Sequence, residues 1–176
     1  MKNSIILIGF MGCGKSTIGK EIAKEYDLHF LDTDAWIEEK EQMTISEMFV
    51  TKGETYFRGL ETKCLEVLLE ESNNNSQSDT LGKVISVGGG LPIKEKNRQL
   101  LKQLGTVIYL KATEETIYNR LKTDTTRPLL QGDNPKQKIK NLMESREDFY
   151  DQASDFVVEV DHKGIRKIVE EIKKYL

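Results

Sequence analysis

The sequence predicts an α/β fold, in which a parallel β-sheet carries helices on both of its faces. Three observations predict it: short aliphatic runs alternate with amphipathic helical patterns, several runs end at glycines or acids, and the pattern covers most of the 176 residues. Strands that alternate with helices are joined by crossovers, which place the helices against both faces of a parallel sheet. The length favours one domain over 1–176.

The composition narrows the class of protein. A formal net charge of −3 argues against a general nucleic-acid or membrane surface, so we expect no partner of either kind. Cys13 and Cys64 give neither a disulfide framework nor metal-ligand spacing. The first apolar run is too short to cross a membrane and lacks a secretory cleavage site. We therefore expect a reducing, cytoplasmic setting.

The first three elements predict a strand, a helix and a second strand. Residues 5–8 are a short aliphatic run that ends at a glycine, which is typical of a strand covered on both faces. Residues 16–26 carry apolar side chains on one helical face. Residues 28–34 then predict a strand that ends in two acids.

Two further helices are predicted before the middle of the chain. Thr44 and Glu47 have capping-box spacing, so a helix should begin after Thr44 and continue through Phe49. Residues 54–71 carry an apolar stripe at helical spacing. Residues 72–82 are polar and aperiodic, and we interpret them as a mobile surface loop because a strand pattern resumes directly after them.

The second half of the chain resumes the alternation. Residues 83–90 predict a strand that runs into three glycines, and further strand patterns lie at 106–110 and 155–160. The remaining helical patterns lie at 93–103, 113–122, 135–152 and 163–176.

The stretch between the first strand and the first helix predicts a phosphate site. Gly9, Gly14, Lys15 and Ser16 fit the P-loop pattern G-x-x-x-x-G-K-[ST]. Backbone N–H groups in such a loop surround a triphosphate when no side chains intrude, and the N-terminus of the following helix adds donors. The lysine supplies a cation, and the serine hydroxyl is a ligand for Mg²⁺. The residues assigned to ATP here are Gly12, Cys13, Gly14, Lys15, Ser16 and Thr17.

Two acids follow the second strand. Asp32 and Asp34 should face the same crevice as the P-loop, because ligands of parallel sheets gather beyond the carboxyl ends of the strands. Two carboxylates there suit a Mg²⁺ shell and an acceptor hydroxyl. Without the P-loop, a turn or a helix cap would explain them equally well.

Later residues supply candidate cations. Arg58 and Glu61 lie three apart on a helix and form a predicted ion pair. An exposed surface pair is the plainer interpretation, but neighbouring aromatic residues favour a partly enclosed site. Arg127 lies in a polar loop from which it can swing onto phosphates. Arg146 and Tyr150 are one helical turn apart.

The ordered set "GFMGCGKST", "FLDTD", "GETYFR", "VGGG", "RPLL" and "ESREDFY" resembles the shikimate kinases almost end to end. The P-loop alone is typical of a superfamily, whereas the ordered set is far more specific. The resemblance implies a three-layer P-loop NTPase fold with a five-stranded parallel sheet. It also implies transfer of the ATP γ-phosphoryl group to the 3-hydroxyl of shikimate, with Mg²⁺ as cofactor, in the pathway to chorismate and aromatic amino acids.

The resemblance also implies roles for single residues. Lys15 and Arg127 serve the phosphates, and Arg120 lies against adenine. Asp34 contacts the substrate hydroxyls as base or orienting group, whereas Asp32 joins the Mg²⁺ shell through water. The residues implied to hold shikimate are Asp34, Arg58, Gly88, Gly89, Gly90 and Arg146. We expect a substrate-binding region at about 33–61 and a lid at about 122–135, both mobile, in a monomer.

Three alternatives remain open. A kinase of another hydroxy acid, such as gluconate, shares the phosphate chemistry, although the arginine pair and the glycine triplet favour shikimate. A GTPase is disfavoured because the D-x-x-G match at 79–82 follows no strand and no N-K-x-D motif is present. A catalytically silent nucleotide-binding module is disfavoured by the intact set of Asp34, Lys15, Ser16 and Arg127.

Overall fold

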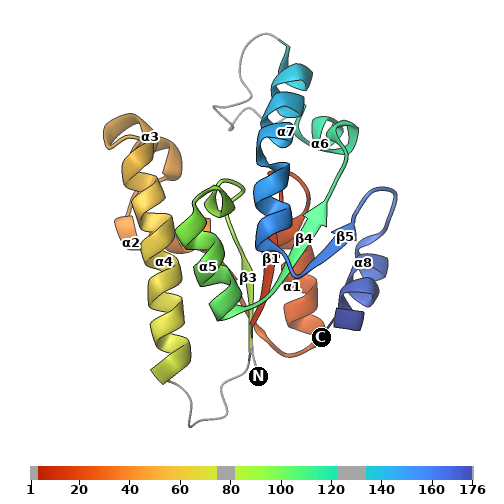
Figure 1. Ribbon diagram of the computed structural model, residues 1–176, viewed down its shortest axis with the longest axis horizontal. Coiled ribbons are helices and arrows are strands. Elements are labelled where there is room, and N and C mark those ends of the chain that lie inside the picture. The colour runs from red at the N-terminus through yellow and green to blue at the C-terminus, as the bar shows by residue number, and fades with distance from the viewer. Residues whose placement is uncertain (1–3, 75–81, 123–133, 176) are drawn as a thin grey trace.

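The central sheet of the protein is parallel and has the strand order β2-β3-β1-β4-β5 (Figure 1). The computed structural model describes residues 4–74, 82–122 and 134–175, and within these ranges the sheet has five strands. The strands are β1 (Ser4–Ile8), β2 (His29–Asp32), β3 (Lys83–Ser86), β4 (Gly105–Lys111) and β5 (Phe156–Glu159). The predicted five-stranded parallel sheet is confirmed.

Helices cover both faces of the sheet (Figure 1). Helices α1 (Lys15–Glu25) and α8 (Ile165–Ile172) pack together on one face. Helices α4 (Glu54–Asn74), α5 (Glu95–Leu104) and α7 (Pro135–Ala153) lie side by side on the other. Since β1 lies between both layers, all five of its residues are buried, which explains its uninterrupted aliphatic sequence.

The connections place two loops at the switch point of the sheet. β1 and β3 are neighbours in register, with Leu7 opposite Ser86. The chain leaves β1 toward α1 on one face and leaves β3 toward α5 on the other. Where neighbouring strands of a parallel sheet send their connections to opposite faces, a crevice opens beyond their carboxyl ends. The P-loop and the glycine triplet therefore border one crevice.

One helix was not predicted. Residues 33–34, expected at the end of a strand, instead begin α2 (Thr33–Glu41). Asp32 is the N-cap, and its carboxylate accepts hydrogen bonds from the backbone N–H groups of Asp34 and Ala35. Only Thr33 and Ile37 are buried in α2, so its apolar stripe is too weak to see in the sequence.

The next two helices agree better with the sequence. Thr44 and Glu47 form the predicted capping box at the start of α3 (Ile45–Thr51). Helix α4 extends to Asn74, so residues 72–74 are helical and the expected loop begins too early. Residues 75–81 lie outside the described ranges.

Shorter elements complete the fold. The turn η1 (Leu91–Ile93) follows the glycine triplet, α6 (Glu114–Leu121) follows β4, and η3 (Lys173–Tyr175) ends the described chain. Within the described ranges, no helix combines the length and the apolar character that crossing a bilayer requires.

Candidate active site

The P-loop is shaped by close backbone packing. Gly9 has a φ of +141°, and a Cβ at this position would lie 2.6 Å from the carbonyl oxygen of Leu110 on β4. The N-cap of α1 is Gly14, which has no side chain that could cap the first turn. The N–H groups at the start of α1 therefore face the crevice as donors for an anion.

Lys15 is held within the same loop. Its side chain is buried, and its ammonium group donates to the carbonyl oxygens of Gly9 at 2.9 Å and Phe10 at 3.1 Å. Cys13 is also buried, with its sulfur 3.8 Å from this ammonium group. The loop thus places one cation among backbone groups at the edge of the sheet.

A cluster of small oxygen-bearing side chains adjoins the P-loop. The hydroxyl of Ser16 donates to the Asp32 carboxylate at 2.7 Å and lies 3.3 Å from the hydroxyl of Ser86. Hydroxyl and carboxylate oxygens are the ligands that Mg²⁺ prefers. The donor set of Ser16 and Asp32 therefore fits this ion, completed by water.

The first cavity, of about 390 Å³, contains these groups. Its walls come from the P-loop, the start of α1, the acids after β2, the residues after β3, and α6. The lining residues are Met11, Gly12, Gly14, Lys15, Ser16, Thr17, Asp32, Asp34, Ser86, Val87, Gly88, Gly89 and Arg120. Arg120 donates to the carbonyl oxygens of Gly12 and Cys13, each at 3.0 Å.

A second cavity, of about 360 Å³, lies against the first. Met11, Asp34, Gly88 and Gly89 line both cavities and form the wall between them. The other lining residues of the second cavity are Glu38, Ile45, Ser46, Phe49, Phe57, Arg58, Glu61, Gly90 and Arg146. The first cavity, which contains the P-loop and is called the phosphate cradle below, thus adjoins the second cavity, a partly apolar chamber that contains two arginines.

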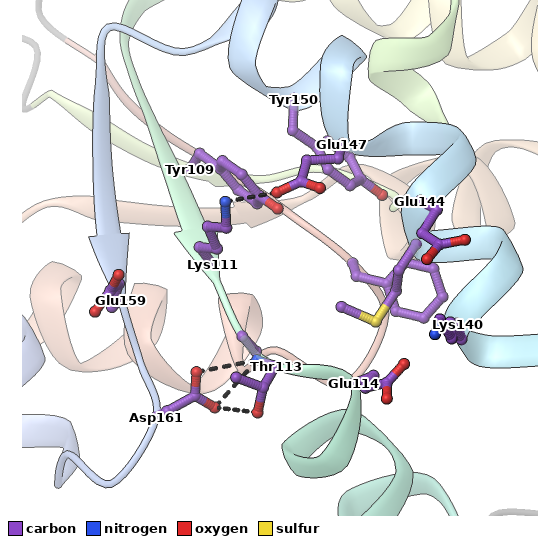
Figure 2. Close-up of a pocket in the computed structure, with 13 residues that line it drawn as sticks. Tyr109, Lys111, Thr113, Glu114, Lys140, Glu144, Glu147, Tyr150, Glu159 and Asp161 are labelled. Carbon is purple, nitrogen blue, oxygen red and sulfur yellow. Dashed lines mark hydrogen bonds and ion pairs between the residues drawn. The ribbon is translucent and has the colours of Figure 1, made fainter. Parts of the chain in front are cut away.

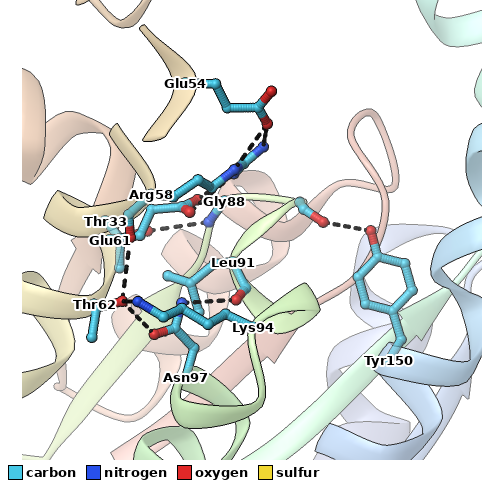
Figure 3. A network of polar contacts seen from close by, with 11 residues as sticks. Thr33, Glu54, Arg58, Glu61, Thr62, Gly88, Leu91, Lys94, Asn97 and Tyr150 are labelled. Carbon is cyan, nitrogen blue, oxygen red and sulfur yellow. Dashed lines mark hydrogen bonds and ion pairs between the residues drawn. The ribbon is translucent and has the colours of Figure 1, made fainter. Parts of the chain in front are cut away.

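Arg58 is fixed by two carboxylates at the edge of the second cavity (Figure 3). Its guanidinium contacts both oxygens of Glu61, at 2.9 and 3.0 Å, and donates to Glu54 at 2.8 Å. Glu61 is only 1% exposed. Burial raises the pKa of the Glu61 carboxyl to about 7, although the Arg58 guanidinium opposes this shift. The predicted ion pair exists, and it is not an exposed surface pair.

The aromatic residues next to Arg58 differ in their roles. Phe57 lines the second cavity and packs against Phe49, with ring centroids 5.2 Å apart. Tyr56 instead hydrogen-bonds to Glu41 and Lys52 on the exposed surface. The expected enclosure is therefore correct, but Phe49 and Phe57 provide it.

Arg146 reaches the second cavity from α7. Its side chain is buried, and its guanidinium lies 5.9 Å from the centroid of the Phe10 ring. Within the described part of the chain, its Nε has no hydrogen-bond partner. A buried guanidinium with one such free donor is suited to an anionic ligand.

The glycine triplet allows these groups to approach closely. A Cβ on Gly88 would lie 2.5 Å from Oδ1 of Asp34. A Cβ on Gly90 would lie 2.7 Å from Nη2 of Arg58. Bare backbone at both positions is therefore needed if the carboxylate and the guanidinium are to lie where they do.

A third cavity, of about 340 Å³, lies between β4, β5 and α7 (Figure 2), and Phe10 is one of its lining residues. Five acids line it: Glu114, Glu144, Glu147, Glu159 and Asp161. Lys111 pairs with Glu147 at 2.5 Å, and Asp161 accepts hydrogen bonds from Thr113 (Figure 2). Its carboxylates disfavour a phosphate or a carboxylic acid as the ligand of this cavity.

The structure brings most of the residues singled out in the sequence to these two adjoining cavities. Arg127 and most of the expected lid at 122–135 lie outside the described ranges. The sequence reasoning missed Met11 in the shared wall and Glu38 in the second cavity. Met11 occupies a variable position of the P-loop pattern, and Glu38 belongs to none of the motifs, so no sequence signal marked either side chain.

Comparisons with known proteins identify the family of this chain. A family model described as "Shikimate kinase" matches residues 11–176. The chain belongs to the shikimate kinase family. A shikimate kinase from Sulfurihydrogenibium sp. (strain YO3AOP1) is 43% identical over 172 residues, which cover 98% of this chain and 96% of that protein.

Solved structures of this family have the same fold. Shikimate kinase from Acinetobacter baumannii in complex with shikimate is 34% identical, with a TM-score of 0.88, covering 98% of this chain and 92% of that one. A gluconokinase from Sinorhizobium meliloti 1021 is 17% identical, with a TM-score of 0.53, covering 97% of this chain and 89% of that one. At that identity the gluconokinase shares the fold alone.

Proposed function

We propose that this chain transfers the γ-phosphoryl group of ATP to the 3-hydroxyl of shikimate and releases shikimate 3-phosphate. Family membership makes it an ATP-dependent kinase. One observation carries the site assignment: the phosphate cradle and the chamber with two arginines share a wall that contains Asp34. Donor phosphate and acceptor hydroxyl can meet only where two such compartments adjoin.

Arg58 and Arg146 hold the substrate carboxylate in this proposal. They line one cavity from α4 and α7, and charge-assisted hydrogen bonds from two guanidinium groups fix both the position and the orientation of a carboxylate. The backbone of Gly88, Gly89 and Gly90 lies under the ring. The apolar side chains of Phe49 and Phe57 support the carbon skeleton.

Asp34 aligns the hydroxyl that is phosphorylated. Its carboxylate lies in the wall between the two cavities, so it faces the acceptor and the phosphates at once. It accepts the hydroxyl proton or orients the hydroxyl as oxygen attacks phosphorus and the bond to ADP breaks. Lys15 and the N–H groups of the P-loop stabilise the charge that spreads over the phosphoryl oxygens. Arg127, from the proposed lid, adds to that charge stabilisation.

The cofactor proposed is Mg²⁺. Ser16 and, through water, Asp32 would hold it, since their oxygens lie 2.7 Å apart beside the phosphate cradle. When bound, the ion neutralises negative charge on the phosphates. Asp32 also caps α2, and the cap fixes its carboxylate for this task.

The remaining assignments concern adenine, assembly and compartment. Arg120 lines the first cavity and donates to the carbonyl oxygen of Gly12 in the P-loop, which supports its placement against adenine. We infer a monomer, because one chain supplies the walls of both cavities. We infer a cytoplasmic location, supported by two buried free cysteines.

A coupled ATP-consumption assay with three acceptor conditions tests the proposed function. We expect Mg²⁺-dependent ADP release with shikimate and only background release with gluconate or without an acceptor. Product analysis should give shikimate 3-phosphate. Equal rates with gluconate would contradict the assignment of shikimate as the specific acceptor. Equal rates without any acceptor would indicate an ATPase.

A further inference from the structure

Three buried side chains on different elements bind the loop that follows β3 (Figure 3). The backbone N–H of Gly88 donates to the hydroxyl of Thr33 at 3.1 Å. The hydroxyl of Tyr150 donates to the carbonyl oxygen of Gly89 at 2.6 Å. The amide of Asn97 donates to the carbonyl oxygen of Leu91 at 2.9 Å. The loop is thus held from α2, α7 and α5.

Two of these anchors lie close in sequence to side chains of the proposed substrate site. Thr33 precedes Asp34, and Tyr150 follows Arg146 by one helical turn. The loop therefore positions each of these two side chains through a neighbour on the same helix. Asn97 can position Arg58, on α4, only if a further residue connects the two.

Thr62 provides that link, one helical turn after Arg58 (Figure 3). Its hydroxyl contacts the Oδ1 of Asn97 at 2.8 Å and the carbonyl oxygen of Arg58 at 3.2 Å. A hydroxyl has one proton, and the shorter contact places it on Asn97. Lys94 donates to the same hydroxyl at 3.1 Å. Thr62 is 6% exposed and Asn97 is 1% exposed, so water cannot replace the hydrogen bond between them at low cost.

We propose that Thr62 and Asn97 are a positioning pair that sets the distance between the Arg58 guanidinium and the backbone of the glycine loop. The guanidinium of Arg58 packs directly on Gly90. A small shift between α4 and the loop would therefore move this guanidinium relative to the ring of the bound shikimate. The pair acts through Arg58 and touches no substrate. This inference rests on the proposed function, in which Arg58 binds the substrate carboxylate.

The test compares Thr62→Val with Thr62→Ser. Valine keeps the shape of threonine but leaves the Oδ1 of Asn97 without its donor, whereas serine keeps the hydroxyl. We expect the valine variant to raise KM for shikimate about tenfold, the equivalent of about one buried hydrogen bond. KM for ATP should stay unchanged, and the serine variant should resemble wild type. Thr62→Ala, which cannot overpack the site, repeats the comparison if the valine variant does not fold.

A destabilised control separates positioning from general loss of stability. Val158→Ala in β5 removes buried volume and lines no cavity described above. It should lower the melting temperature and leave both KM values unchanged. A further measurement uses the Arg58→Ala background: if Thr62 acts through Arg58, adding Thr62→Val there raises KM for shikimate no further.

The outcomes separate the two proposals. A valine variant with unchanged KM for shikimate, or an effect that persists in full without Arg58, would overturn the positioning role in an active enzyme. A wild-type chain that consumes no ATP with shikimate would instead overturn the proposed function, and the inference with it.

Discussion

Replacing the buried carboxyl of Glu61 with an amide should change how stability depends on pH. The folded chain raises the pKa of Glu61 from 4.5 to about 7, chiefly because the carboxyl is buried. A carboxyl with a raised pKa favours the folded state below pH 4.5, and this contribution is lost as pH rises through the folded value. At about 1.36 kcal/mol for each pKa unit, the loss is roughly 3 kcal/mol.

The assay is denaturant unfolding of wild type and Glu61→Gln between about pH 4 and pH 8. The free energy of unfolding of wild type, minus that of the variant, should fall by roughly 3 kcal/mol across this window, because glutamine does not titrate. Glu54→Gln is the matched control, since it removes the exposed partner of the same arginine. A difference that stays flat, or rises with pH, would refute the account of Glu61.

Three substitutions test the substrate site. Arg58→Ala should raise KM for shikimate by about ten- to a hundredfold, since a charged hydrogen bond contributes about 1.5–3 kcal/mol; unchanged kinetics would remove Arg58 from the site. Asp34→Asn should abolish turnover while calorimetry still detects ATP binding, and full activity would contradict the role of Asp34. Gly88→Ala places a Cβ 2.5 Å from Oδ1 of Asp34 and should lower kcat more than it changes KM for ATP; wild-type kcat would show that the carboxylate tolerates displacement.

The sequence identifies the phosphate cradle well, because its chemistry needs consecutive backbone groups. Gly9 to Ser16 form one short segment, so spacing alone predicts the loop. Arg58 and Arg146 are far apart in the chain, and only the resemblance to the family motifs predicted that both lie in one site. Helix α2 escaped notice because packing against α4, rather than periodicity, stabilises it.

The sequence predicted a partly enclosed site for the pair of Arg58 and Glu61, but not the nearly complete burial of Glu61. An Arg and a Glu three residues apart on a helix are usually exposed to solvent. Here α4 turns this pair toward the wall formed by Asp34 and Gly88, and a Cβ on Gly88 would lie 3.3 Å from Oε1 of Glu61. Asp34 comes from the start of α2 and Gly88 from the loop after β3, and both lie more than twenty residues from Glu61 in the chain.

The order of the elements along the chain also separates the two proposed binding sites. In the proposed function the nucleotide site begins after β1, whereas much of the second cavity, which is proposed to bind the acceptor, comes from one continuous insertion between β2 and β3, including Asp34, Phe49, Phe57, Arg58 and Glu61. Both ends of that insertion are anchored in the sheet. Grafting the insertion from a kinase of another hydroxy acid should therefore change much of the second cavity while leaving Lys15, Ser16 and the rest of the P-loop unchanged.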